Sequence, residues 1–242
     1  MDNALSTAVQ MQFMRPRQLE DALRKFPVVY VPFGLIEWHG PQLPLGNDAI
    51  KAHAFLVKTA ERFGGVVYPP VFFHEGFGRE IIDPVVTHLF GQLKLTGARV
   101  IIGITGHNIQ AQVDMIQQAV DTVCADGECA GFAGWEVTLS EGPESATDHA
   151  AKWETSNMMF FYPQFVDMGE LPEGEMDDET KKELGIGGID PSRHASAEVG
   201  RRNVELAHEA IGRKAQELLA SLPEDKQDFA IEGINPKCWW LV

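Results

Sequence analysis

The sequence predicts one α/β domain of three layers, in which helices cover both faces of a mostly parallel sheet. Two observations predict it. Short runs of β-branched and aromatic residues are apolar throughout, which is typical of strands covered on both faces. Stretches with helical periodicity separate these runs, and an alternating order of strands and helices favours a parallel sheet. A chain of 242 residues lies in the size range of one domain, so we expect a single domain over residues 1–242.

The N-terminal part is expected to alternate helix and strand. A proline in the first turn and apolar residues at helical spacing predict a helix over Pro16–Phe26. Val28–Phe33 is a buried strand that we expect to stop at Gly34. A helix follows over Asp48–Phe63, before two glycines, and then a short strand over Val66–Tyr68.

The middle of the chain repeats this order. Residues 72–83 have no clear period, and residues 85–95 are expected to be helical. A buried strand over Arg99–Ile104 leads through a short loop into a helix over Ile109–Ala125. We expect a fourth strand within residues 130–139 and a helix over Asp148–Phe161.

The C-terminal part holds an acidic segment, a long helix and an apolar tail. Glu170–Glu183 is polar and acidic and is expected to be a solvated excursion, or else to fold against a neighbouring subunit. A helix should begin at Asp190 and run to about Leu219. The tail Cys238–Val242 is apolar, so we expect it to pack on the core or on a partner subunit.

Composition excludes several classes of function. There are 20 Lys and Arg against 35 Asp and Glu, a formal charge of −15 that disfavours nucleic acid and anionic membranes as partners. No apolar run approaches the roughly 20 residues that span a bilayer, and no secretory signal pattern is present, so we expect a cytoplasmic protein. Cys124, Cys129 and Cys238 form no C-x-x-C pair and are expected to be reduced packing residues.

Acidic and imidazole side chains follow two of the expected strands. In an extended chain Glu37 and His39 point the same way after the first strand, Asp48 begins a helix nine residues later, and His107 follows the third strand. Functional groups collect at the carboxyl ends of parallel strands. Each residue alone has an ordinary interpretation, as a core histidine, a solvated loop acid or, for Asp48, a helix cap. Together they predict a nitrogen and oxygen site for Zn, Mn or Fe.

These residues belong to motifs that resemble those of the creatininase family. The most specific is residues 34–48, G-L-I-E-W-H-G-P-Q-L-P-L-G-N-D, which closely resembles the family signature G-S-x-E-Q-H-G-P-H-L-P-L-x-T-D. Residues 105–108, T-G-H-N, resemble N-G-H-G-G-N, and residues 148–156, D-H-A-A-K-W-E-T-S, resemble D-H-A-G-x-x-E-T-S. Residues 188–200 resemble the late segment G-x-x-G-D-P…A-x-x-E-x-G. The resemblance spans about residues 16 to 220.

The resemblance implies a creatininase-like α/β fold and a metal centre with one or two divalent ions, Zn or Mn, with Fe as an alternative. It implies that Glu37, His39, Asp48 and His107 are ligands, with Asp48 able to bridge two ions. It also implies that His149 and Glu154 stand beside the metals as catalytic residues. His149 suits proton transfer to a leaving group. The alternatives are a solvent-facing His149 capped by Asp148 and a surface acid at position 154.

The chain departs from creatininase at positions that bear on metal and substrate. Creatininase has a Glu two residues after the histidine matched by His107, and this chain has Ile109. Either Glu154 completes the second ligand set or only one ion binds tightly. Gln42 replaces a histidine of the signature, and Asn108 with Ile109 replaces a glycine pair. These changes disfavour creatinine as the substrate.

Candidate substrate contacts are His74, Glu75, Arg79 and Asn108, of which the first three lie in the aperiodic stretch after the second strand. We expect a metal-dependent amidohydrolase that cleaves the C–N bond of a small cyclic amide. The alternatives are a ring-opening C–C hydrolase of a cyclic keto-polyol, such as a dehydro-inosose, and a small-molecule binding protein without activity. The resemblance also implies a homo-oligomer, commonly a hexamer.

Overall fold

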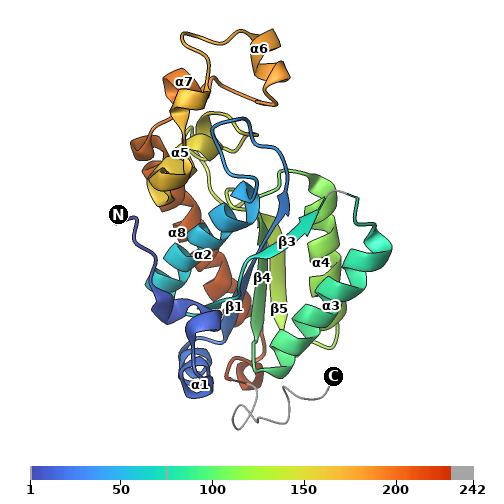
Figure 1. The fold of residues 1–242 in the computed structure, drawn as a ribbon. Coiled ribbons are helices and arrows are strands. Elements are labelled where there is room, and N and C mark those ends of the chain that lie inside the picture. The colour runs from blue at the N-terminus through green and yellow to red at the C-terminus, as the bar shows by residue number, and fades with distance from the viewer. Residues whose placement is uncertain (1, 75, 230–242) are drawn as a thin grey trace.

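One parallel sheet lies at the centre of the molecule. The computed structural model describes residues 2–74 and 76–229. The strands are β1 (Val28–Ile36), β2 (Val66–Val67), β3 (Val71–His74), β4 (Val100–Thr105) and β5 (Ala130–Trp135). The order is β2-β1-β4-β5, and β3 pairs with the end of β1 where β2 pairs with its beginning (Figure 1).

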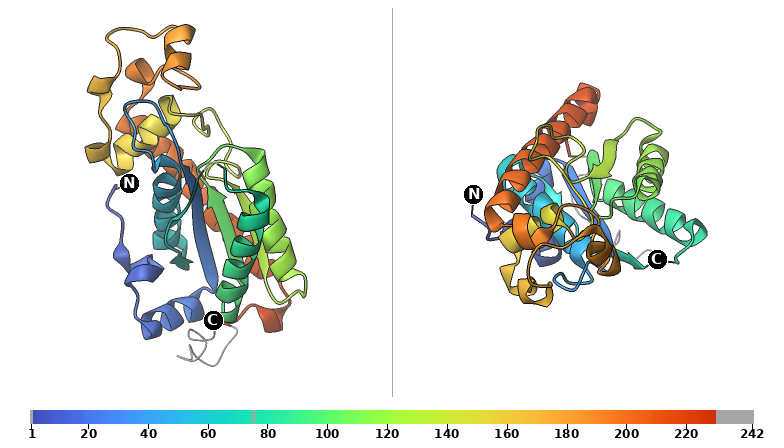
Figure 2. Two further views of the ribbon diagram at one scale, coloured as in Figure 1. Left: turned by 45° about the vertical axis from the view of Figure 1, so that its right-hand side comes forward. Right: turned by 90° about the horizontal axis from the view of Figure 1, so that it is seen from above.

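Helices form a layer on each face of the sheet (Figures 1 and 2). One layer contains α2 (Asn47–Phe63), α5 (Lys152–Phe161) and α8 (Ala197–Ser221), and the other contains α3 (Arg79–Leu95) and α4 (Gln110–Cys124). The remaining helices are α1 (Pro16–Lys25), α6 (Asp178–Glu183), α7 (Pro191–His194) and the 3₁₀ turns Thr7–Val9, Met11–Phe13, Pro163–Phe165, Met168–Glu170 and Glu224–Lys226. The predicted three-layer α/β fold is confirmed.

The alternation of β1 side chains divides the core into two parts. Val29, Val31 and Phe33 pack in the cluster that includes side chains of α3 and α4. Val28 and Tyr30 pack in the cluster that includes side chains of α2 and α8. All five are fully buried, which explains why this strand is apolar throughout rather than alternating with polar residues.

Three predicted boundaries are wrong. The helix expected over Asp148–Phe161 begins only at Lys152, because residues 148–151 form the loop before α5. β1 continues through Gly34 to Ile36, because Gly34 makes room for α2 instead of ending the strand. The long C-terminal helix is interrupted: α7 ends at His194, and α8 begins after Ser196, whose hydroxyl accepts a hydrogen bond from the Val199 amide at 3.2 Å. Local capping by Ser196 restarts the helix.

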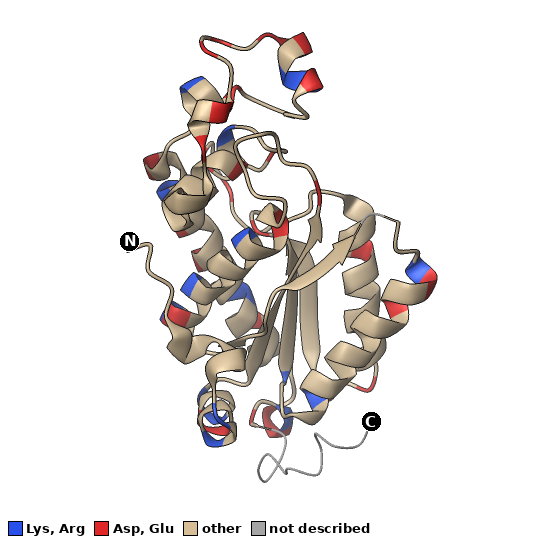
Figure 3. Ribbon diagram, viewed as in Figure 1, with Lys and Arg blue, Asp and Glu red and all other residues tan. Residues whose placement is uncertain are grey.

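Two segments contain more regular structure than their sequences predict. The aperiodic stretch 72–83 contains most of β3 and the first turn of α3. The acidic excursion contains α6, which carries both signs of charge (Figure 3). β3 and α6 are short, so their sequences show too few periods to be recognised.

The prediction that the cysteines are reduced is wrong for two of them. Cys124 and Cys129 form a disulfide, with their Cα atoms 5.0 Å apart. Cys124 is the last residue of α4, and a turn at Gly127, with φ of 75°, brings the chain back toward β5. This turn brings the cysteines together without a C-x-x-C spacing. The tail 238–242 lies outside the described residues. None of the described helices is long and apolar enough to cross a membrane.

Candidate metal centre

The predicted ligands meet at the carboxyl ends of β1 and β4. These strands pair in parallel, with Phe33 opposite Thr105, so both end at the same edge of the sheet. Glu37 directly follows β1 and His107 lies two residues after β4. Asp48 is the second residue of α2, and Glu154 lies in the first turn of α5.

Two glycines let α2 approach both strand ends. A Cβ atom at Gly34 would lie 2.3 Å from the Cβ of Asp48, and one at Gly106 would lie 2.2 Å from the carbonyl oxygen of Asp48. Real Cβ atoms do not approach so closely, so any other residue at either position would displace the helix. Gly34 and Gly106 therefore place the Asp48 carboxylate between the two strand ends.

The polar atoms are close enough to share cations. His39 Nε2 lies 2.8 Å from Asp48 Oδ1, and His107 Nδ1 lies 2.8 Å from Glu37 Oε1 and 3.5 Å from Asp48 Oδ2. Three sets of side chains each have ligand atoms within 4.8 Å of one another: Glu37 with Asp48 and His107, His39 with Asp48 and Glu154, and Glu37 with His39 and His149. Asp48 belongs to two of these sets. A mixed imidazole and carboxylate arrangement without sulfur fits Zn or Mn.

Asp48 does not act as a helix cap. The N-cap position of α2 is Gly46, and no side chain makes a capping hydrogen bond there. Instead, Asp48 Oδ2 accepts a hydrogen bond from the Leu35 amide at 3.2 Å. The carboxylate therefore faces the end of β1 and the two histidines.

Burial and charge perturb the ionisation of this cluster. Burial favours the neutral acid, but hydrogen bonds from His107 and His39 hold the pKa of Asp48 well below its usual range. Burial opposes protonation of His107, yet hydrogen bonds to Asp48 and Glu37 raise its pKa to about 9. Burial also opposes protonation of His39, and the Asp48 hydrogen bond and the Glu154 charge outweigh it, so its pKa is raised. Cation binding must displace protons from these imidazoles.

His149 lies beside the cluster on the loop before α5. Its ring centroid is 4.7 Å from that of His39, and the side chain is half-buried. Asp148 accepts hydrogen bonds from the amides of Trp153 and Glu154, at 2.9 and 3.1 Å, so it holds the start of α5. Asp148 therefore caps the helix as the alternative proposed, but His149 faces the cluster rather than open solvent.

Glu154 is a buried acid, only 1% exposed, and not a surface residue. Its Oε2 accepts a hydrogen bond from the Ala150 amide at 2.8 Å and lies 3.7 Å from His39 Nε2. Ala150 has a φ of 53°, the only positive value among the described residues other than glycine. Such strained residues concentrate at functional sites, and here the unusual backbone aims an N–H group at Glu154.

Sequence reasoning missed two charged residues beneath the cluster, Lys51 and Glu136. Lys51 is 1% exposed and its Nζ makes a hydrogen-bonded ion pair with Glu154 Oε1. The same Nζ lies 3.4 Å from Glu136 Oε1. Burial raises the pKa of Glu136 to about 7, while the Lys51 charge opposes this rise. Glu136 directly follows β5. Functional groups collect at the carboxyl ends of parallel strands, so Glu136 would have been a candidate if the sequence had shown where this strand ends.

The predicted substrate contacts that the structure describes lie on three different segments of the chain. Asn108 Nδ2 donates to Thr147 Oγ1 and to the Asp148 carbonyl, at 2.7 and 2.6 Å, so it holds the loop that carries His149. Arg79 is paired at the start of α3, at 2.9 Å from Asp83 and 2.7 Å from Gln118. His74 ends β3 opposite Ile36 and is exposed, and Glu75 lies outside the described residues.

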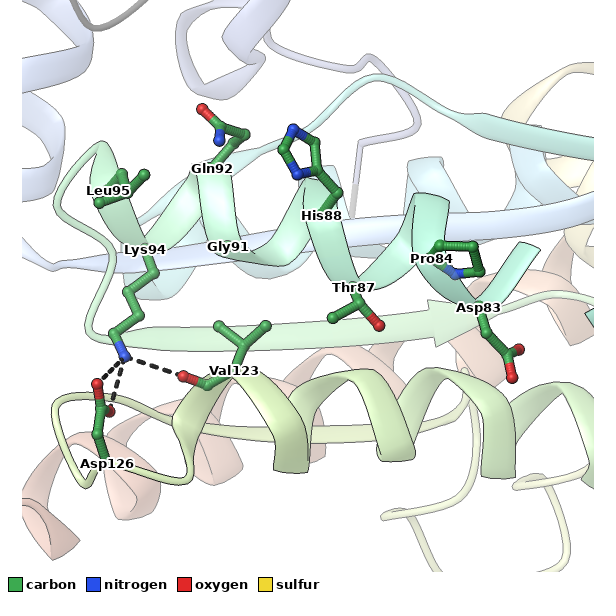
Figure 4. A pocket seen from close by; sticks show the side chains of 10 residues that line it. All are labelled: Asp83, Pro84, Thr87, His88, Gly91, Gln92, Lys94, Leu95, Val123 and Asp126. Carbon is green, nitrogen blue, oxygen red and sulfur yellow. Dashed lines mark hydrogen bonds and ion pairs between the residues drawn. The ribbon is translucent and has the colours of Figure 1, made fainter. Parts of the chain in front are cut away.

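Two hollows bear on where a substrate can bind. One, of about 520 Å³, is lined by His149, by Asp178 and by residues of the stretch 181–188 other than Glu183 and Leu184. Trp38 borders that stretch, because its Nε1 donates to the Leu184 carbonyl at 2.7 Å. The other hollow lies between α3 and α4 (Figure 4), where Lys94 is paired with Asp126 at 2.6 Å. Of these two hollows, the one beside His149 adjoins the candidate metal centre.

A family model and several known proteins resemble this chain. The model described as creatininase, creatinine amidohydrolase, matches residues 12–217. A mycofactocin precursor peptide peptidase of Mycolicibacterium smegmatis is 32% identical over 161 residues, 60% of this chain and 62% of that protein. A 3-dehydro-scyllo-inosose hydrolase of Thermotoga maritima is 24% identical over 202 residues, 71% of this chain and 65% of that protein. The chain thus matches less than two thirds of the length of either relative.

Solved structures share the fold at low sequence identity. A crystal structure of creatinine amidohydrolase superposes with a TM-score of 0.72 and 18% identity, over 88% of this chain and 99% of that one. A structure described as creatininase with Mn gives a TM-score of 0.69 at 17% identity, over 86% and 98% of the two chains. A mutant creatininase described as of Zn-Zn type gives 0.71 at 18% identity, over 88% and 98%. These similarities establish the arrangement of strands and helices.

Proposed function

Because this chain belongs to the creatininase family of hydrolases, we propose that it is a divalent-metal-dependent amidohydrolase that cleaves the C–N bond of a small cyclic amide. The observation that carries the proposal is the position of Asp48. Its carboxylate belongs to two sets of three potential ligands, and His149 stands beside them. Asp48 is buried, and no side chain makes a capping hydrogen bond at the start of α2, so it is neither a surface acid nor a helix cap.

The residues of the cluster offer two positions for a metal ion. Glu37, Asp48 and His107 would hold one ion, and His39, Asp48 and Glu154 offer a second position. A bound divalent ion would polarise the substrate carbonyl and lower the pKa of water. Both carboxylate oxygens of Glu154 are engaged, one by Lys51 and one by the Ala150 amide, which disfavours a role as a proton carrier.

His149 is the residue suited to move a proton. It lines the hollow of about 520 Å³ and also lies next to His39. A ring nitrogen of His149 can take a proton on the metal side and deliver it to the leaving nitrogen on the substrate side. Hydrogen bonds of Asn108 and Asp148 hold the loop that carries His149 in place.

The activities after which related proteins are named support amide chemistry. One relative is named as a peptidase and the family model as an amidohydrolase, and both names denote C–N cleavage. A second candidate function is ring opening of a cyclic keto-polyol by C–C cleavage, favoured by the relative named as an inosose hydrolase, whose match covers 71% of this chain. Both reactions begin at a polarised carbonyl.

A substrate panel tests the proposal. Metal-free protein would be given Zn or Mn and assayed on cyclic amides, short peptides and cyclic ketoses. We expect turnover of a cyclic amide that disappears on chelation and returns with metal. His149→Gln should abolish most of this turnover, whereas His194→Gln, a change at an exposed histidine of α7, should not. Turnover confined to ketoses would replace C–N by C–C cleavage, and chelator-resistant turnover would contradict the metal mechanism.

A further inference from the structure

A fully buried cation lies next to the second metal position. Lys51 projects from α2 with only 1% of its surface exposed, and its ammonium pairs directly with Glu154 Oε1. The same ammonium donates to the Gly106 carbonyl at 3.4 Å, at the end of β4. A buried ammonium is costly unless it is paired and hydrogen-bonded, and Glu154 supplies that pair here. The proposed hydrolytic steps do not use this charge.

The position of Lys51 determines which ligands its charge affects. The other oxygen of Glu154 lies 3.7 Å from His39 Nε2, within the set formed by His39, Asp48 and Glu154. The ammonium thus contacts this set directly, through the carboxylate of Glu154. The set formed by Glu37, Asp48 and His107 includes no direct contact with Lys51 among the described ion pairs. Repulsion by Lys51 therefore acts most strongly on a cation beside Glu154.

We propose that the Lys51 ammonium takes the place of a second metal ion, so that the centre holds one tightly bound divalent cation, at Glu37, Asp48 and His107. This inference rests on the proposed metal-dependent function and adds the number of metal ions that each chain binds tightly.

Charge balance supports one ion. Glu37, Asp48 and Glu154 are the three carboxylates of the two ligand sets, and one divalent ion together with Lys51 neutralises them. The fourth acid, Glu136, lies 3.4 Å from Lys51, and burial raises its pKa to about 7. A second divalent ion would leave excess positive charge in a site where His39 and Asp48 are fully buried.

Ligand supply supports the same conclusion. Ile109, two residues after His107, is 51% exposed and has no atom that binds a metal. The second position therefore depends on Glu154, the one ligand whose charge Lys51 already compensates. Sharing this carboxylate with an ammonium weakens it as a ligand.

Cobalt titration of metal-free protein tests the inference. Co²⁺ would be followed by its visible absorption, and the bound metal counted by elemental analysis after gel filtration. We expect wild-type protein to bind one equivalent tightly and a second about a hundredfold more weakly. Lys51→Met should strengthen the second equivalent by about tenfold or more, because it removes the neighbouring positive charge. Lys58→Met is a matched control, since Lys58 is also buried on α2 but pairs with Glu61.

The possible outcomes separate this inference from the proposed function. If Lys51→Met fails to fold, Lys51→Met with Glu136→Gln removes the ammonium together with Glu136, the buried acid 3.4 Å from it that would lose its counter-charge, and should still strengthen the second equivalent. Two equivalents of similar affinity in wild-type protein would overturn the inference and leave the metal-dependent function intact, and so would variants that remain at one equivalent. Absence of any bound metal in wild-type protein would instead refute the proposed function.

Discussion

Replacing Asp48 by Asn separates a metal ligand from an ordinary buried acid. The change preserves shape and removes one negative charge from the point where both ligand sets meet. In the metal-free protein it weakens charged hydrogen bonds to His39, at 2.8 Å, and to Leu35, at 3.2 Å. Hydrogen bonds to charged groups contribute about 1.5–3 kcal/mol each, so we expect a loss of about that size in the free energy of unfolding.

The effect on metal should be larger. Loss of a residue that only supports a ligand costs about 10-fold to 100-fold in metal affinity, so loss of a shared ligand should cost about a hundredfold or more. Metal affinity would be measured by competition with a chelator, and unfolding by denaturant titration. The matched control is Asp190→Asn, because Asp190 is also buried but caps α7. An Asp48→Asn protein with wild-type metal affinity and turnover would refute the assignment of Asp48 as a ligand.

Three further predictions follow from the site and from the chain. His149→Gln should lower kcat by about a hundredfold to ten-thousandfold while metal content stays at the wild-type level, because proton transfer is lost and no ligand is; loss of metal would show that His149 is a ligand instead. The pKa of His107 is raised from 6.5 to about 9 in the metal-free fold. Its pairing therefore stabilises that fold fully below pH 6.5, and this contribution is lost as pH rises through about 9. Thermal unfolding of metal-free protein between pH 6 and 10 should show the decline, and a stability that rises over this range would contradict it. Light scattering at micromolar concentration should give the mass of a homo-oligomer, with a hexamer expected, and a monomer mass would exclude it.

The strands and helices that bury long apolar runs could be predicted from the sequence, since burial on both faces leaves a continuous signal. β1 and β4 are such elements, and their parallel pairing brings Glu37 to His107. The role of Gly34 could not be predicted, because a glycine that ends a strand and one that admits a helix look the same. Only the 2.3 Å approach to Asp48 distinguishes them.

The charged layer beneath the site was harder to predict. Lys51 stands one helical turn after Asp48, where an isolated lysine in an amphipathic helix is normally placed at the surface. Its burial depends on Glu136 and Glu154, which come from distant parts of the chain. The disulfide between Cys124 and Cys129 likewise depends on a turn at Gly127 that the cysteine spacing does not reveal.

Anomalous X-ray scattering from crystals of the metal-replete protein tests the central claim most directly. With Zn or Mn supplied, we expect a strong anomalous difference peak between the carboxylates of Glu37 and Asp48 and the imidazole of His107, at ligand distances of about 2.0–2.2 Å. Metal-replete crystals without a peak between these three side chains would contradict the account of this site as a metal centre.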